Sequence, residues 1–228
     1  MKRIGLIGGM SWESTLPYYR IINSVIMEKK GELYSADCIL YSVNFQEIES
    51  TISKNDWDTS DRILSNAAQK LELCGVDFLA ICSNTMHKCI PAIKENVNLP
   101  ILHIVDSTSN VMKKRGITSA LLIGTRFTME EDFNKDLFEK DGIEIKTPNY
   151  EDRNIIHQII FDELCRGIIN IKSKNIYKNI IMKYCGKDDG VILGCTEIGL
   201  LIGQKDLEVP VFDTTKIHAE AIAKESLK

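Results

Sequence analysis

The sequence predicts an α/β fold of two pseudo-symmetric lobes, each a mostly parallel sheet flanked by helices. Two short apolar runs, residues 76–85 and 190–197, each stop at a small nucleophilic residue that a helix-capping residue follows. Two earlier runs, residues 4–11 and 121–128, each lead from an apolar stretch into a turn of glycine and hydroxyl residues. The two kinds of turn are separated by nearly the same length of chain in both halves, which indicates an internal duplication.

The two nucleophile turns are expected to form two halves of one active site, in the cleft between the lobes. A buried parallel strand delivers the side chains that follow it to the carboxyl edge of its sheet, where open α/β folds bind their ligands. We expect lobe 1 to span residues 1–100 and lobe 2 to span residues 101–211. A C-terminal helix at about 212–228 is expected to pack back on lobe 1.

The composition is that of an ordinary globular protein. Of 228 residues, 44% are hydrophobic and 26% are charged, so the chain can bury a core in one large domain or two lobes. A net charge of −4 without a basic stripe argues against a nucleic-acid surface. No apolar segment approaches the roughly 20 residues that span a bilayer, and no signal peptide precedes the first strand. A cytoplasmic location without membrane contact is therefore expected.

The first lobe should alternate strands and helices. Apolar residues at helical spacing predict a helix over 12–30, in which Pro17 is tolerable only within the first turn. A strand over 38–43 should lead into a polar loop at 44–47, before an amphipathic helix over 58–73. The elements expected next are the strand before Ser83, a helix from about Thr85 that Pro91 interrupts or bends, a strand over 102–106 and a helix ending near Arg115.

The second lobe should repeat this order. Its first strand is expected over 119–124, and a helix over 129–140 should follow, with Thr128 as its cap and acidic residues in its first turn. The elements expected after it are a strand over 143–147, helices over 152–169 and 176–185, the strand before Cys195, a strand over 209–212 and the closing helix.

Cys195 stands apart from the other six cysteines. The seven are irregularly spaced, without a C-x-x-C pair or a paired histidine motif. This pattern excludes the common zinc sites and argues against a disulfide scaffold. Most should be small apolar core residues, whereas Cys195 lies in a turn before a helix. Backbone N–H groups there are expected to lower the pKa of the thiol from about 8.5 towards neutrality. Two such groups facing each other could exchange protons with opposite faces of one carbon, as a two-base racemase requires.

Four sequence blocks resemble a known family. They are IGGMSWEST at 7–15, NTMH at 84–87, GCTEIG at 194–199 and FDTTKIHAE at 212–220. On these blocks the chain resembles the aspartate/glutamate racemases, which work without pyridoxal phosphate. The resemblance implies two α/β lobes, an active site in the cleft between them, no cofactor and a homodimer. It also implies one cysteine before the Asn-Thr of the first lobe and another before the Thr-Glu of the second.

The first of these cysteine positions departs from the family pattern. Ser83 directly precedes Asn84, and Cys82 lies one place earlier. Successive strand side chains point to opposite faces, so we expect Ser83 at the catalytic position and Cys82 in the core. A shifted register or a bulge would put Cys82 there instead. A serine hydroxyl is a poor general base near neutral pH, which weakens two-thiol catalysis.

The chain is similar to those family members that carry a hydroxyl residue at this position and act on L-aspartate or L-glutamate. The resemblance then implies that Cys195 removes the α-proton of the L-enantiomer. It implies that Ser83, directly or through a water, supplies the proton on the other face. Because enantiomers have equal free energies in water, a hydroxyl there can only slow both directions or alter substrate affinities.

Further residues are candidates for binding or support. Hydroxyl, amide and N–H groups at the turns can bind carboxylates, although the same groups also cap helices. For His87 and His218 a structural hydrogen bond is the commoner role, and support of the catalytic groups the rarer one. Arg126 and Arg166 are the cations to test against a side-chain carboxylate. The predicted substrate contacts are Met10, Ser11, Gln46, Asn84, Thr85, Thr125, Thr128, Thr196 and Glu197.

The sequence thus predicts a cofactor-independent racemase of an acidic amino acid, aspartate or glutamate or both. No metal-ligand cluster and no lysine in a Schiff-base context is recognisable, so neither a metal nor a cofactor is expected. The expected partners are the amino-acid substrate and a second copy of the chain, with no nucleic acid and no membrane. Two alternatives stay open: a single-cysteine decarboxylase or isomerase of the same superfamily, and a weakly catalytic protein that binds an acidic amino acid.

Overall fold

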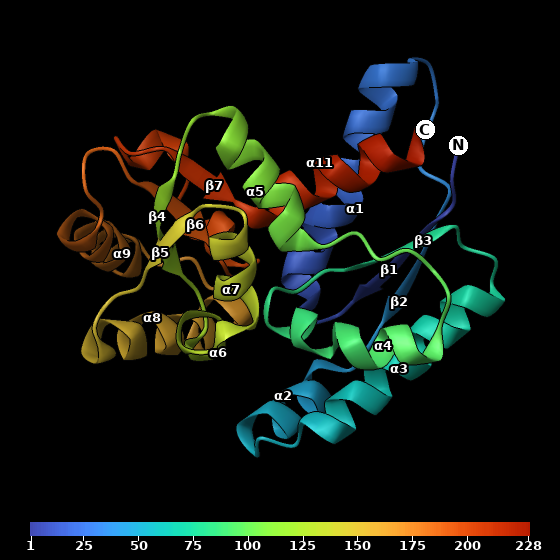
Figure 1. Cartoon of the computed structure of the whole chain (residues 1–228), viewed down its shortest axis with the longest axis horizontal. Helices are drawn as coiled ribbons and strands as arrows, with labels where there is room; N and C mark the ends of the chain where they lie inside the picture. Colours follow the sequence, from blue (N-terminus) through green and yellow to red (C-terminus); the bar gives the residue numbers. More distant parts are fainter. The chain divides into compact units, whose positions relative to one another are not determined.

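A separate parallel sheet organises each of two structural units. The computed structural model describes residues 1–228. Unit 1 consists of residues 1–103 and 218–228, and unit 2 consists of residues 104–217. Figure 1 shows the helices and strands of both. All strand pairings are parallel, which confirms the predicted fold class of two sheets flanked by helices.

Unit 1 has a three-stranded sheet in the order β2-β1-β3. The central strand β1 (Ile4–Gly8) pairs with β2 (Cys38–Ser42) on one side and β3 (Phe78–Ile81) on the other. The helices are α1 (Trp12–Lys30), α2 (Phe45–Ser53), α3 (Trp57–Leu73), the 3₁₀ helix η1 (Thr85–Cys89), α4 (Ile90–Asn96) and α11 (Thr214–Ser226) from His218 onward.

Unit 2 has a four-stranded sheet in the order β5-β4-β6-β7. The strands are β4 (Ser119–Ile123), β5 (Glu144–Lys146), β6 (Gly190–Leu193) and β7 (Val211–Asp213). The helices are α5 (Ile104–Lys114), α6 (Arg126–Glu130), α7 (Asp132–Lys140), α8 (Tyr150–Asp162), η2 (Leu164–Arg166), α9 (Ile171–Tyr184), α10 (Ile198–Leu201) and η3 (Gln204–Asp206), followed by the start of α11.

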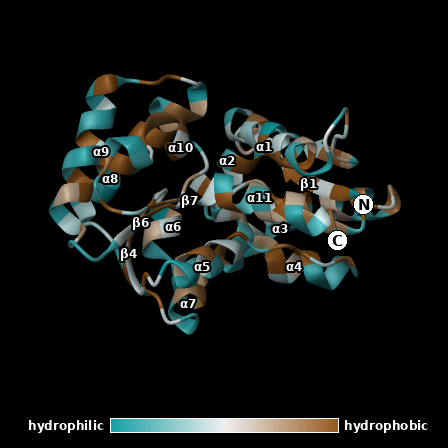
Figure 2. Ribbon diagram, turned by 90° about the horizontal axis from the view of Figure 1, so that it is seen from above, coloured by the Kyte–Doolittle hydropathy of each residue, from teal (hydrophilic) through white to brown (hydrophobic).

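Alternation along the strands divides the core of unit 2 between two faces of its sheet. Leu121 and Ile123 pack with apolar residues of α8 and α9, whereas Ala120 and Leu122 pack with residues of α5 and α7. Both faces of the strands are covered, so they read as continuous apolar runs. Figure 2 shows brown and teal segments side by side along α8 and α9, as expected of helices that bury one face and expose the other.

The core of unit 1 lies where β1 and β3 meet two helices. Ile4 and Leu6 pack with Tyr18 of α1 and with Ile222 of α11. The prediction of a helix over 12–30 is confirmed, but Pro17 lies in its second turn. None of the helices in either unit combines the length with the apolar character that a membrane span requires.

Two element predictions in the first half of the chain are wrong. Residues 44–47 are not a loop, because the Asn44 side chain accepts a hydrogen bond from the Gln46 N–H and begins α2. The strand predicted over 102–106 is also absent. Only Ile101 forms an isolated parallel bridge, and α5 already begins at Ile104. Within this helix, Thr108 Oγ1–H donates to the Ile104 oxygen at 2.8 Å.

Two helix predictions in the second half also need correction. The helix predicted over 129–140 is two helices, α6 and α7, and Thr125 rather than Thr128 caps the first of them. The helix predicted over 152–169 ends at Asp162, and a left-handed Gly167 with φ +71° closes the following 3₁₀ turn.

Candidate functional site

The glycine turn and the nucleophile turn of unit 2 touch at their backbones. Gly194 N–H donates to the Ile123 oxygen at 2.7 Å, which joins the ends of β6 and β4. A Cβ atom on Gly124 would lie 2.8 Å from the Gly194 oxygen, and one on Gly194 would lie 3.1 Å from Thr128 Cγ2. These close approaches favour glycine at both positions, so the backbone brings Thr128 beside the residue that precedes Cys195.

Cys195 lies buried against a carboxylate. It is 7% exposed, and its Sγ–H donates to Glu197 Oε2 at 3.0 Å. Thr196 Oγ1–H donates to the same oxygen at 3.0 Å, and Glu197 is only 2% exposed. Two residues predicted to contact substrate, Thr196 and Glu197, are therefore bonded to each other, and Glu197 also holds the thiol.

The prediction that the pKa of the Cys195 thiol is lowered is wrong. Burial, and then the Glu197 carboxylate, raise the pKa of Cys195 well above the ordinary thiol value, because both disfavour a thiolate. A backbone hydrogen bond from Glu197 acts in the opposite direction but has the smaller effect. The helix expected to stabilise the thiolate, α10, has only four residues, so it offers little dipole.

The first residues of α11 hold the nucleophile turn in place. Thr214 Oγ1–H donates to the Leu193 oxygen at 2.7 Å, at the end of β6. Thr215 Oγ1–H donates to the Thr196 oxygen at 3.2 Å. The hydroxyls of the block at 212–220 therefore support the backbone around Cys195.

Two side chains that sequence reasoning missed lie beside this turn. Cys165 of η2 packs against the core that contains Cys195. Tyr177 of α9 is fully buried, and its hydroxyl donates to the Ile156 oxygen at 3.2 Å. Burial and then Glu197 raise the pKa of Cys165, and burial and then Cys195 raise the pKa of Tyr177. No sequence spacing signals this cluster, because its members come from separate elements.

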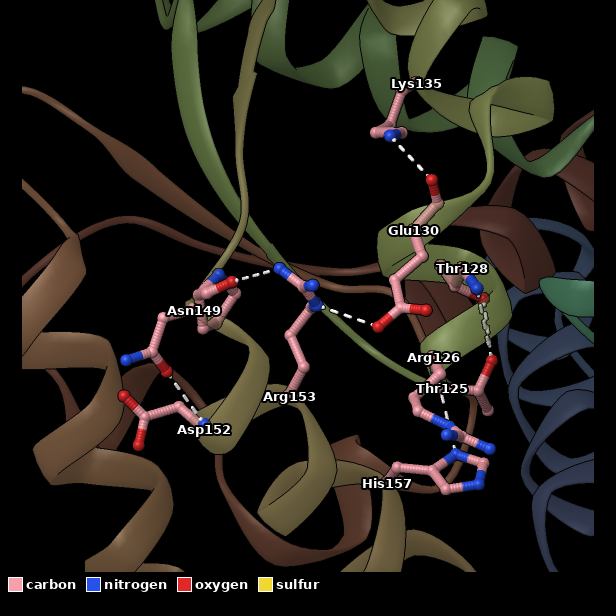
Figure 3. Close-up of polar contacts among 10 residues, drawn as sticks. Thr125, Arg126, Thr128, Glu130, Lys135, Asn149, Asp152, Arg153 and His157 are labelled. Atoms are coloured by element: carbon pink, nitrogen blue, oxygen red, sulfur yellow. Dashed lines mark hydrogen bonds and ion pairs between the residues drawn. The ribbon is translucent and has the colours of Figure 1, made fainter.

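Thr125 and Thr128 form a hydroxyl pair at the start of α6 (Figure 3). Thr125 Oγ1 accepts from the Thr128 N–H at 3.3 Å, and the two hydroxyl oxygens lie 3.2 Å apart. Arg126, which directly follows Thr125, donates its backbone N–H to His157 Nδ1 at 3.4 Å. Arg126 is half-buried, whereas Arg166 is exposed on η2.

The glycine turn of unit 1 is tied to the first turn of α1. Gly9 has φ +90°, and its N–H donates to Thr15 Oγ1 at 2.9 Å, while Thr15 Oγ1–H donates to the Ser11 oxygen at 2.8 Å. A Cβ atom on Gly9 would collide with the backbone of Val43, so the end of β2 lies against this turn. Met10 and Ser11, both predicted to contact substrate, are 4% and 1% exposed.

The nucleophile turn of unit 1 follows β3. Cys82 N–H donates to the Ile7 oxygen at 2.8 Å, so β3 ends beside the glycine turn. Cys82 is fully buried in the core with α1 and α11, and burial raises the pKa of its thiol. Ser83, Asn84 and Thr85 follow at the carboxyl edge of the sheet and are also buried.

Three histidine rings of unit 1 lie close to one another. His87 Nδ1 donates to the Ser83 oxygen at 2.6 Å, so this ring holds the Ser83 backbone. Its centroid lies 4.5 Å from that of His103 and 5.9 Å from that of His218. Sequence reasoning missed His103, because it assigned that residue to a strand. Burial, and then the other two rings, hold the pKa of His87 well below its ordinary value.

His218 is bonded on both sides of its ring. Its Nε2–H donates to the Leu102 oxygen at 2.9 Å, which leaves Nδ1 to accept from the Tyr18 hydroxyl at 2.9 Å. Burial lowers the pKa of His218 to about 4. The ring is therefore neutral at neutral pH and makes structural hydrogen bonds.

Gln46 is the predicted contact that the structure keeps apart from the others. It is exposed in the first turn of α2, and its Nε2 donates to Glu49 Oε2 and Ser50 Oγ, each at 3.3 Å. These partners lie on the same helix. No hydrogen bond joins Gln46 to another predicted site residue.

Each unit thus presents a glycine turn and a nucleophile turn at the carboxyl edge of its own sheet. Unit 2 offers a thiol, a carboxylate and several hydroxyls, which are groups suited to proton transfer and to binding an anion. Unit 1 offers a serine hydroxyl with its amide and hydroxyl neighbours. No group of three or more His, Cys, Asp or Glu side chains is arranged to hold a metal ion.

Comparison with known proteins gives concordant results. The family model described as Asp/Glu/Hydantoin racemase matches residues 7–222. A crystal structure from Yersinia pestis, assigned as an Asp/Glu racemase, is similar with a TM-score of 0.89 and 48% identity over 100% of both chains. An aspartate racemase homologue from Pyrococcus horikoshii OT3 has a TM-score of 0.85 and 36% identity, again over 100% of both chains. Broad specificity amino-acid racemase RacX of Bacillus subtilis (strain 168) is 23% identical, over 96% of this chain and 95% of its own length.

Proposed function

Because the chain belongs to the Asp/Glu/hydantoin racemase family and is an amino-acid racemase, we propose that it racemises an acidic amino acid, aspartate or glutamate, without a cofactor. In this proposal Cys195 and Ser83 are the two groups that exchange protons with the α-carbon. The observation that carries the proposal is the Cys195 thiol, which lies 3.0 Å from a buried carboxylate in the nucleophile turn of unit 2.

The carboxylate of Glu197 solves a problem that the raised pKa of Cys195 creates. A protonated thiol cannot act as a base, and burial opposes its ionisation. Transfer of the Sγ proton to Glu197 Oε2 gives a thiolate and a neutral carboxylic acid, so the net charge of the buried pair does not change. The thiolate then takes the α-proton of the L-enantiomer and is again a thiol. The electron pair of the broken C–H bond passes into the substrate as an enediolate.

Stabilisation of that enediolate is assigned to the turns that surround the thiol. Its negative charge develops on the α-carboxylate, where hydroxyls and backbone N–H groups can bind it more strongly than in the ground state. Thr125 and Thr128 belong to the turn that touches the Cys195 turn and are suited to this role. Thr196 is also close, and it additionally orients the Glu197 carboxylate.

Ser83 is assigned to the opposite face of the α-carbon. Its hydroxyl, directly or through a water, gives a proton to the enediolate, and the D-enantiomer results. The Ser83 oxygen is then reprotonated from solvent, and Glu197 releases to solvent the proton that it took from Cys195. Both steps together restore the starting protonation states within the turnover. A hydroxyl transfers protons less readily than a thiol at neutral pH, so racemisation should be slower than with two thiols. The His87 ring contributes by fixing the backbone of this residue.

The names of the relatives support the substrate class in two ways. The Yersinia pestis and Pyrococcus horikoshii structures are assigned to aspartate or glutamate racemases or their homologues, at 48% and 36% identity. RacX, at 23% identity, is a broad specificity enzyme. A wider range of amino acids is therefore the second outcome that the assay must be able to detect.

Exchange of the α-proton in D₂O, measured over a panel of both enantiomers, tests the proposed function. We expect deuterium incorporation with inversion for aspartate or glutamate, unaffected by EDTA or hydroxylamine, because all proposed groups belong to the chain. Cys195→Ser should lose essentially all exchange, since a general base contributes about 10²–10⁴ in rate. Release of CO₂ from a substituted malonate without exchange would instead support a decarboxylase. Stabilisation by the amino acid with neither reaction would support a binding protein.

A further inference from the structure

Arg126 carries a positive charge that no acidic side chain of the chain neutralises. Its Nε is buried and has no hydrogen-bond partner, and the guanidinium forms no ion pair. Glu130 stands at the i+4 position where a helical ion pair is expected. Its carboxylate instead accepts from Arg153 Nε at 3.0 Å, as Figure 3 shows. A buried donor of a charged group without a partner is costly, so its retention at this place needs a reason.

The surroundings of Arg126 strengthen any ion pair that it forms. Its backbone N–H is held by His157, whose ring centroid lies 4.8 Å from that of Phe161 and 6.3 Å from that of Phe127. Burial, and then the charge of Arg126, lower the pKa of His157, so the imidazole is neutral at neutral pH. The neutral ring is half-buried beside two aromatic side chains, and none of the three carries a charge that would compete for an anion. Electrostatic attraction is larger in such an environment than in bulk water.

The position of Arg126 in the fold links it to the reacting groups. It lies between Thr125 and Thr128 in the turn that touches the backbone before Cys195. The other cation considered from the sequence, Arg166, is exposed on η2, where solvent screens its charge. The structure therefore separates two arginines that the sequence leaves equivalent.

We propose that Arg126 binds the side-chain carboxylate of the substrate and thereby sets the preference for acidic amino acids. A carboxylate would accept from the two Nη groups, which have no hydrogen-bond partner in the chain and, unlike the Nε, are not among its fully buried side-chain atoms. The α-carboxylate is left to the hydroxyls and N–H groups of the turns. The inference rests on the proposed function, because it concerns the substrate of that reaction.

Two variants with a matched control test this assignment. Arg126→Gln removes the charge, Arg126→Lys keeps it without the planar fork, and Arg166→Gln removes an exposed charge of the same unit. For Arg126→Gln we expect kcat/KM for aspartate or glutamate to fall about 10- to 100-fold, mainly through KM, since charge-assisted hydrogen bonds contribute about 1.5–3 kcal/mol. The same variant should change exchange on asparagine or glutamine by less than about 3-fold. Arg126→Lys should recover part of the loss, and Arg166→Gln should behave as the wild type.

Binding of L-aspartate and L-asparagine, measured by calorimetry, provides a readout that does not require turnover. Arg126→Gln should weaken aspartate binding by the same factor and leave asparagine binding unchanged, in protein that unfolds at the wild-type temperature. Equal losses for both ligands, or no loss for either, would overturn the inference. Wild-type protein that binds aspartate through Arg126 but exchanges no α-proton would refute the proposed racemisation and leave this inference standing.

Discussion

The thiol of Cys195 is governed by its burial and by the carboxylate two residues further along the chain. Burial and the carboxylate at 3.0 Å act together to keep it protonated, although the same carboxylate is the nearest acceptor for its proton. The pair therefore resembles a nucleophile with its general base more than a thiolate stabilised by a helix. Two substitutions probe this residue and its counterpart in unit 1.

Replacing Glu197 with glutamine should lower the pKa of Cys195. The substitution removes the negative charge that opposes ionisation and keeps a hydrogen-bonding side chain in place, while burial still holds the pKa above the ordinary thiol value. The rate of Cys195 alkylation by iodoacetamide, followed by peptide mass spectrometry, should therefore reach its half-maximum at a lower pH than in the wild type. Glu208→Gln, at an exposed position of unit 2, is the control. A midpoint that is unchanged or higher would contradict the assigned contact.

Ser83→Cys should accelerate racemisation, most visibly from the D-enantiomer, whose α-proton the group at position 83 takes in the proposed mechanism. The change places a thiol at both positions, and we expect a gain of about 10-fold or more, within the range of general acid–base effects. It adds little volume, so its stability cost should stay below about 1.5 kcal/mol. Cys82→Ala is the control and should lose some core packing and little activity, because Cys82 is fully buried among apolar residues. Loss of turnover in Cys82→Ala with no effect of Ser83→Cys would show that Cys82 is the acting residue.

At the level of secondary structure elements, glycine turns let two parallel strands end close enough to combine their side chains. The contact between the turns after β4 and β6 depends on the absence of a side chain at Gly124, where a Cβ atom would lie 2.8 Å from the Gly194 oxygen. That obstacle is backbone, so it cannot move aside as a flexible side chain would. The same contact places Thr125 and Thr128 beside the Cys195 turn.

Gly124→Ala should therefore push the two turns of unit 2 apart. We expect the free energy of unfolding to fall by about 1–3 kcal/mol, as for other overpacked sites, and α-proton exchange to fall more than 10-fold. Gly203→Ala is the matched control, because a Cβ atom there meets nothing within 4 Å, and its free energy of unfolding should change by less than about 0.5 kcal/mol. Denaturant unfolding and the exchange assay measure both quantities. Equal effects of the two substitutions would show that the close approach does not matter.

The whole molecule carries buried or half-buried histidines that are neutral at neutral pH. Burial lowers the pKa of His218 to about 4, and the pKa values of His87 and His157 are lowered for the same leading reason. An unfolded chain binds protons at these histidines below about pH 6.5, while the folded protein does not. The unfolded state therefore gains protons first on acidification, and the protein loses stability.

Acid destabilisation should consequently begin near pH 6.5 and, for the His218 contribution, be complete near pH 4. The 2.5-unit difference between about 6.5 and about 4 corresponds to on the order of 3 kcal/mol for this residue. His218→Gln removes the titrating group and should flatten the dependence of unfolding free energy on pH across this window, although it lowers stability at neutral pH. Urea denaturation at a series of pH values measures both curves. Parallel curves for the variant and the wild type would exclude His218 as a source of the acid sensitivity.

Local patterns were enough to predict much of the fold and the family. The apolar runs became β1, β3, β4 and β6 because buried parallel strands are covered on both faces and read as continuous apolar stretches. The helix over 12–30 was predicted to the residue from its periodicity. The sequence blocks around Cys195 and Asn84 identified the family that the comparisons confirm. The roles of the individual site residues stay predictions.

Other features depend on neighbours that are distant in the chain. Residues 102–106 look like a strand by composition, but α5 already begins at Ile104. The pKa of Cys195 was predicted to fall because a helix N-terminus follows it, whereas burial and the Glu197 side chain raise it. The half-buried Arg126 and the exposed Arg166 are equivalent in the sequence and differ only in the folded chain.

The physical reason for this division is the range over which each effect acts. Strand and helix periodicity, capping and glycine turns are properties of a few consecutive residues, so the sequence by itself determines them well. Burial arises only when segments remote in sequence are packed together, and together with nearby charges it decides the ionisation of side chains. The sequence by itself determined the family, the α/β class and the position of the nucleophile turns. Only the tertiary structure decided that burial raises the pKa of Cys195 and that Arg126 keeps an unpaired charge.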